Sequence, residues 1–165
     1  MAKCRLFLCV LLLAGCHEMF GPAVHLKNAE QYSRQQNYDK AIEEYRAHIA
    51  DRLHVHNRPE WENPYFYLIL IGDLQLLQEK PEEALKSYNE AEADGVDTSL
   101  VSDRYRSLAH WYETRGNFEK AVEILKIRRE QDPILFDAML DRVSKEIVHE
   151  EDAQSELKSQ KKAQK

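Results

Sequence analysis

The stretches NYDKAIEEY (residues 37–45), KPEEALKSY (80–88) and NFEKAVEIL (117–125) decide the fold of this chain, because they align without a gap. Each has an alanine at its fifth position, namely Ala41, Ala84 and Ala121. Twelve residues before each alanine stands another small residue, namely Ala29, Gly72 and Ala109. Small residues let two helices approach closely, and units of this kind must stack to bury their apolar faces. The sequence therefore predicts repeated helix pairs.

Large side chains surround the small ones at matching positions. Nine residues before the alanines stand Tyr32, Gln75 and Tyr112. Three residues before them stand Tyr38, Pro81 and Phe118, and four residues after them stand Tyr45, Tyr88 and Leu125. Helix starts are marked by Pro22, by Asn63 followed by Pro64, by Pro81 and by Pro133, and Gly116 with Asn117 ends one helix. Few glycines and many Glu, Gln, Lys, Ala and Leu residues favour helices over a β-rich fold.

This pattern resembles the tetratricopeptide repeat, a helix–turn–helix unit of about 34 residues. The copy at 102–133 matches best, through Tyr105, Leu108, Ala109, Tyr112, Gly116, Phe118, Ala121 and Pro133. The first copy departs from the family at His25 and Asn28, where large apolar residues are preferred. At a later position that usually holds a small residue, the first copy has His48 and the third has Arg128. An unrelated helical bundle is the alternative.

The resemblance implies an all-α fold, a short tetratricopeptide-type α-solenoid of about three helix pairs. The expected repeats cover about 22–55, 65–98 and 102–133, a helix at 133–150 caps the last pair, and the domain spans 22–150. Residues 151–165 carry many charges and no apolar stripe, so they are expected to form a disordered tail.

The first sixteen residues contain all three cysteines, Cys4, Cys9 and Cys16. Lys3 and Arg5 precede the apolar run 6–14, an order typical of a secretory signal peptide and too short for a comfortable membrane span. The ending LAGC (13–16) resembles the lipobox of bacterial lipoproteins. An ordinary signal peptide that ends near a cysteine is the alternative.

The lipobox resemblance implies a signal peptide at 1–15, an acylated (palmitate-type) Cys16 and a short tether at 16–21. The mature chain would then hold no free thiol and no disulfide. His17 stands where an Asp would retain many lipoproteins at the inner membrane. The expected location is therefore the bacterial cell envelope, lipid-anchored, on the periplasmic side of the outer membrane.

Charge and motifs limit the function classes. The net charge is −6, and removal of Lys3 and Arg5 makes it more negative, which argues against a nucleic-acid partner. No nucleophile-elbow, phosphate-loop or HExxH motif occurs. A loop holds His54, His56, Glu60 and Glu62, but no second ligand motif supports a metal there. No catalytic residue, metal, cofactor or small-molecule substrate is expected, and the chain is not expected to be an enzyme.

The resemblance implies a partner-binding groove along the first helix of each pair. Aligned positions in the first copy are Leu26, Glu30, Ser33 and Arg34; in the second copy, Phe66, Ile69, Asp73, Leu76 and Leu77; in the third copy, Arg106, His110, Glu113 and Thr114. Leu26 and Glu30 replace the Lys and Asn with which chaperone-binding members hold a terminal carboxylate. Residues 65–77 (YFYLILIGDLQLL) are apolar on nearly every side, so this segment is either groove or core.

These expectations combine into a membrane-anchored tetratricopeptide adaptor or scaffold lipoprotein that binds another envelope protein. Lipoproteins of similar design serve in pilus-type and outer-membrane assembly machines. A self-associating structural lipoprotein is the alternative, and a metal-dependent binder using the 54–62 loop is a third hypothesis.

Overall fold

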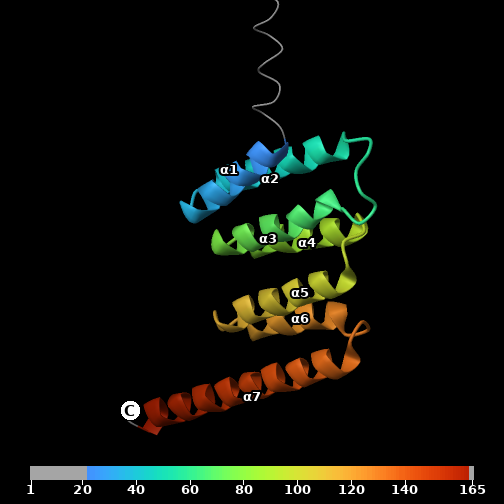
Figure 1. The fold of residues 1–165 in the computed structure, drawn as a ribbon. Coiled ribbons are helices and arrows are strands. Elements are labelled where there is room, and N and C mark those ends of the chain that lie inside the picture. The colour runs from blue at the N-terminus through green and yellow to red at the C-terminus, as the bar shows by residue number, and fades with distance from the viewer. Residues whose placement is uncertain (1–21, 164–165) are drawn as a thin grey trace, which may run out of the picture. The chain divides into compact units, whose positions relative to one another are not determined.

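The computed structural model describes residues 22–163, so the predicted signal peptide, Cys16 and the whole tether lie outside the described residues. The described chain is all-α, which confirms the predicted fold class (Figure 1). Its helices are α1 (Pro22–Arg34), α2 (Tyr38–Leu53), a 3₁₀ turn η1 (Pro64–Phe66), α3 (Tyr67–Leu77), α4 (Pro81–Ala93), α5 (Thr98–Glu113), α6 (Phe118–Arg128) and α7 (Pro133–Ala163). The chain divides into two compact units, the first ending at Val96 and the second beginning at Asp97.

The first unit contains two helix pairs, α1 with α2 and α3 with α4, with α2 also packed on α3 (Figure 1). The small residues predicted to allow close approach are fully buried, among them Ala29, Ala41 and Ala84. At Gly72 the approach is closest, because an added Cβ would lie only 2.7 Å from Cδ1 of Tyr88. Only glycine fits against that ring, which fixes the distance between α3 and α4.

The turns within the three helix pairs share one backbone geometry. Gln36, Glu79 and Gly116 all have positive φ angles, of 59°, 61° and 71°. The amide that follows each of them donates to a carbonyl five residues earlier, over 2.9, 2.9 and 3.0 Å. These are Schellman turns, in which a left-handed residue satisfies the last carbonyls of a helix. The sequence repeat is therefore also a repeat of backbone conformation.

The start of the third helical segment follows its predicted cap. The side chain of Asn63 accepts a hydrogen bond from the amide of Tyr65 over 3.0 Å, and Pro64 opens the 3₁₀ turn that leads into α3. The Asn63 amide group also donates to the carbonyl of Asp94 over 3.0 Å. One side chain thus caps η1 and ties it to the end of α4.

The second unit contains the pair α5 and α6, with α7 packed on α6 (Figure 1). The helix α7 is anchored by Phe136 and Val143, which are fully buried. Ala109 and Ala121 are also fully buried, as in the pairs of the first unit. At the turn into α7, Arg129 donates to Asp137, with Nε 2.5 Å from Oδ1.

The tail prediction differs from the structure. Residues 151–165 were expected to be disordered and the capping helix was expected to end at 150, but α7 continues to Ala163. The described side chains of 151–161 are exposed, so no apolar burial holds them. The segment is helical because Glu, Ala, Gln, Leu and Lys propagate an existing helix at little cost.

Within residues 22–163, no helix is both long enough and apolar enough to span a membrane.

Candidate functional site

The accessible face at the end of η1 and along α3 carries a stripe of four residues, three of them apolar and one acidic. Phe66 and Leu77 are 40% and 62% exposed, and Leu70 and Asp73 between them are half-buried. The spacings of four, three and four residues place these side chains on one helical face, three turns long. We call this set the α3 stripe.

Asp73 is held in place from beneath the α3 stripe. The hydroxyl of Tyr88 on α4 donates to Oδ1 of Asp73 over 2.9 Å, so the carboxylate is oriented by the neighbouring helix. The stripe is therefore apolar at both ends, with an oriented acceptor near its middle. The apolar ends of such a face suit an apolar segment of a partner.

The predicted groove residues of the second copy divide between surface and core. Phe66, Asp73 and Leu77 lie on the α3 stripe, and Leu76 is half-buried beside it. Ile69 is only 1% exposed, so its placement in the groove was wrong and it belongs to the core. On a helix Ile69 is rotated about 100° from Leu70, which turns its side chain to the packed side of α3. Leu70, which the sequence reasoning missed, occupies the accessible position instead.

The predicted groove residues of the first copy form a polar surface on α1. Glu30 and Arg34 are exposed and make an ion pair of 3.4 Å one turn apart. Leu26 and Ser33 are half-buried. Exposed pairs of this kind contribute about 0–1 kcal/mol to stability, so both side chains can exchange their partner for another at small cost.

In the second unit, one predicted groove residue is already engaged. Glu113 is buried, accepts a hydrogen bond from Nη2 of Arg142 in α7 and forms an ion pair with its Nη1, so it does not face a groove. His110 and Thr114 are exposed, and the half-buried Arg106 pairs with Asp103 over 3.0 Å. The prediction at Glu113 was wrong because its partner, Arg142, lies in α7, which is outside the aligned repeats.

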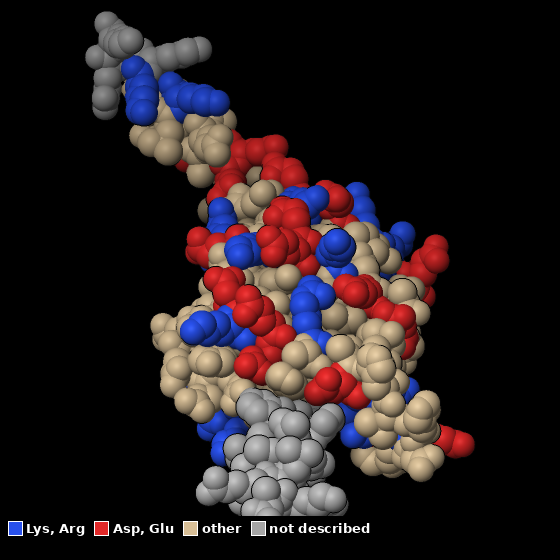
Figure 2. All heavy atoms as spheres, turned by 90° about the horizontal axis from the view of Figure 1, so that it is seen from above, with Lys and Arg blue, Asp and Glu red and all other residues tan. Residues whose placement is uncertain are grey.

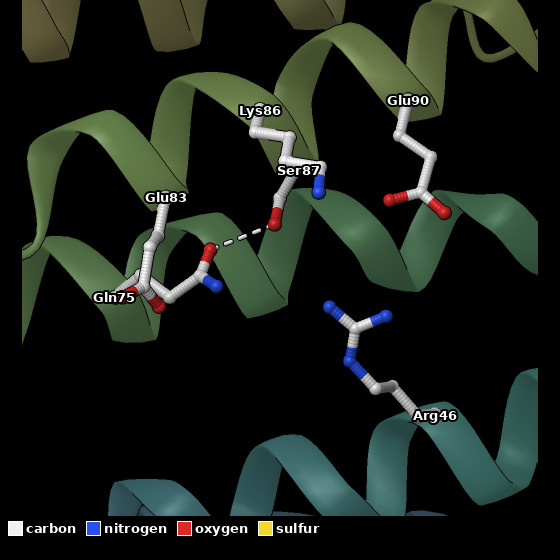
Figure 3. Close-up of a pocket in the computed structure, with 6 residues that line it drawn as sticks. All are labelled: Arg46, Gln75, Glu83, Lys86, Ser87 and Glu90. Carbon is white, nitrogen blue, oxygen red and sulfur yellow. Dashed lines mark hydrogen bonds between the residues drawn. The ribbon is translucent and has the colours of Figure 1, made fainter.

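A polar cavity of about 430 Å³ lies in the first unit (Figure 3). It is lined by Arg46 of α2, Gln75 of α3, and Glu83, Lys86, Ser87 and Glu90 of α4. The hydroxyl of Ser87 donates to Oε1 of Gln75 over 2.7 Å, and both residues are buried. Figure 3 shows Arg46 and Glu90 extending toward one another from their two helices. The charged lining makes this cavity unsuited to an apolar segment, unlike the α3 stripe.

The loop that follows α2 is closed by an ion pair. Nε of Arg52 donates to Oε1 of Glu62 over 2.6 Å, and Nη2 contacts the other carboxylate oxygen. This hydrogen bonding lowers the pKa of Glu62 below its usual value. The carboxylate of Glu62 is therefore engaged by Arg52. The described residues contain no cluster of three or more His, Cys, Asp or Glu arranged to hold a metal.

Charges of both signs are interspersed on the face of the molecule that Figure 2 shows, without a broad basic patch. That face offers no continuous positive surface for a polyanion.

No protein-family profile matches the chain, and no curated protein is similar to it. Among solved structures, 20 chains are similar. One of them is the first TPR of Spaghetti (RPAP3) bound to the HSP90 peptide SRMEEVD, with 17% sequence identity, 77% of this chain and 93% of that chain covered, and a TM-score of 0.48.

Proposed function

We propose that this chain is a lipid-anchored adaptor of the bacterial cell envelope, which binds an apolar segment of another envelope protein through the α3 stripe. The observation that carries the proposal is the exposure of Phe66 and Leu77 on one face of a helix that is otherwise largely core. Both side chains keep apolar surface in contact with water, and covering the part that is still exposed would contribute about 1–2 kcal/mol each.

The membrane half of the proposal is supported by the sequence of the N-terminus. The basic start, the apolar run 6–14 and the LAGC ending at Cys16 have the order and spacing of a lipobox signal. His17 after the cysteine favours the periplasmic side of the outer membrane. The adaptor would thus act at the bilayer surface, in an assembly machine of the outer-membrane or pilus type.

Site-specific photocrosslinking in cells tests the α3 stripe. A crosslinker at Leu77 is expected to capture one discrete protein, and the same crosslinker at Glu83 on α4 serves as the exposed control. Leu77→Glu is expected to weaken capture from a crosslinker at Phe66 by about tenfold or more, since a carboxylate would be desolvated against an apolar partner. Equal capture from Glu83 and Leu77 would contradict the stripe.

The same experiment separates the alternative function. If Leu77 captures only a second copy of this chain, and sedimentation shows mass increasing with concentration, the protein is a self-associating envelope component. An adaptor without its partner is expected to stay monomeric.

Lipidation is tested at Cys16. Growth with a clickable fatty acid should label the wild-type chain, and Cys16→Ala should abolish both the label and membrane fractionation. A labelled Cys16→Ala chain would overturn the anchor.

A further inference from the structure

Three exposed apolar residues lie at one end of the first unit. Trp61 is 85% exposed, and Leu53 and Val55 are 39% and 36% exposed. Leu53 is the last residue of α2, and the other two belong to the connection between α2 and η1. An indole ring that is this exposed gains nothing from the fold, which points to a role outside the described chain.

Local hydrogen bonds hold this connection in a defined form. The ion pair of Arg52 with Glu62 joins the residue before Leu53 to the residue after Trp61. Nη1 of Arg58 donates to the carbonyl of Arg52 over 3.1 Å, and the amide of Glu62 donates to the carbonyl of Pro59 over 3.0 Å. We call residues 53–61 the Trp61 loop; its two ends are pinned together beside the end of α2.

The Trp61 loop lies at the end of the unit where α1 begins. His25, in the first turn of α1, contacts two carboxylates of α2: its Nδ1 is 2.5 Å from Glu44 and its Nε2 is 3.7 Å from Asp51. Asp51 directly precedes Arg52, which anchors the loop. The start of α1 is thus fixed to the middle and the last turn of α2, and the Trp61 loop is fixed to the last turn.

We propose that the Trp61 loop contacts the lipid–water interface of the membrane to which the chain is anchored. The inference rests on the proposed lipidation of Cys16. Only five residues separate Cys16 from Pro22, a reach of about 20 Å when fully extended. The anchored end of the first unit therefore stays within that distance of the bilayer, and the Trp61 loop belongs to that end.

The chemistry of the loop fits an interface rather than the bilayer core. Tryptophan concentrates at the headgroup level, where its ring is apolar and its N–H stays hydrated. His54, His56 and Glu60 are exposed beside it and would remain in water. Acyl chains supply the affinity of the anchor, so the added loop contact fixes the orientation of the unit on the membrane.

Fluorescence of the full lipidated protein, purified from membranes and reconstituted, tests this contact. The chain has two tryptophans, so Trp111→Phe leaves Trp61 as the reporter and Trp61→Phe leaves Trp111 as the matched control. Vesicles contain phosphatidylethanolamine and phosphatidylglycerol, with or without brominated acyl chains. Trp61 emission is expected to shift to shorter wavelength on reconstitution and to be quenched by bromine, while Trp111 emission changes little.

The outcomes separate the two proposals. Mass spectrometry of the N-terminal peptide first establishes whether Cys16 carries lipid. A lipidated, vesicle-bound chain whose Trp61 is no more quenched than Trp111 overturns the interface contact and leaves the adaptor intact. A chain without lipid overturns the anchor and, with it, this inference.

Discussion

The guanidinium of Arg142 holds the carboxylate of Glu113 with both of its terminal nitrogens, at 2.8 and 2.9 Å. Glu113 is the last residue of α5 and Arg142 lies in α7, 29 residues further along the chain. The hydrogen bond raises the pKa of Arg142, and the Glu113 side chain that accepts it is only 6% exposed. A position that the repeat alignment assigned to a partner is therefore used within the second unit.

Breaking this pair should destabilise the second unit. Arg142→Met leaves Glu113 buried without its cation, and a cost of about 1–2 kcal/mol is expected, reduced from the fully buried case because Arg142 is half-exposed. Urea unfolding followed by circular dichroism measures it. Lys145→Met, which removes an exposed pair with Asp141, is the control and should stay within about 0.5 kcal/mol of wild type. Equal effects would mean that the Glu113 pair is no different from a surface pair.

Gly72→Ala should be among the most damaging single-methyl additions in the chain. The added Cβ would overlap the Tyr88 ring, so we expect a loss of about 1–3 kcal/mol through forced separation of α3 and α4. In thermal unfolding, Tyr88→Leu should recover part of that loss in the double variant, giving a favourable coupling energy. Additive effects of the two changes would argue that the Tyr88 ring is not what excludes a side chain at Gly72.

The three Schellman turns predict opposite effects for reciprocal substitutions. Gln36 carries a left-handed backbone that glycine adopts without strain, so Gln36→Gly should stabilise the chain by about 0.5–1 kcal/mol. Gly116→Gln places a side chain on the same backbone in open space and should cost about 1 kcal/mol. Differential scanning calorimetry of both variants measures the changes. A stabilising Gly116→Gln would show that the turn conformation does not limit stability.

Acid should release the Trp61 loop. The hydrogen bond from Arg52 lowers the pKa of Glu62 from its usual value of 4.5, so its stabilising contribution is complete above that pH and is lost as the pH falls through the folded value. Glu62→Gln should therefore lower the melting temperature at pH 7, and the difference from wild type should shrink toward pH 3.

The control for this pH dependence is Glu60→Gln, an exposed neighbour in the same loop. Its difference from wild type should be small at pH 7. A Glu62→Gln deficit that persists unchanged at pH 3 would assign the effect to packing rather than to charge.

The helix pairs could be predicted because their signals are local. Two small residues stand twelve positions apart in every copy, as Ala29 and Ala41 do in the first. Asn63 followed by Pro64 marks a helix start regardless of what packs around it. The exposed face of α3 could not be predicted, since Ile69 and Leu70 are equally apolar and no periodicity separates them.

Two further predictions differ from the structure. One fails because of a contact between residues distant in sequence, and the other concerns a segment that makes no tertiary contact. Glu113 meets Arg142 only after α6 has turned the chain, so a repeat alignment cannot anticipate the pair. Beyond residue 150 no apolar face exists, and α7 continues on helix propensity alone.

The ion pair between Arg52 and Glu62 closes the segment between them into a loop whose two ends lie side by side. The two ends of the segment are fastened to each other by Arg52 and Glu62, and Arg58 within the segment adds a hydrogen bond to the end of α2. A foreign peptide of similar length could be inserted between these two anchors and displayed at the surface while the repeats keep their packing.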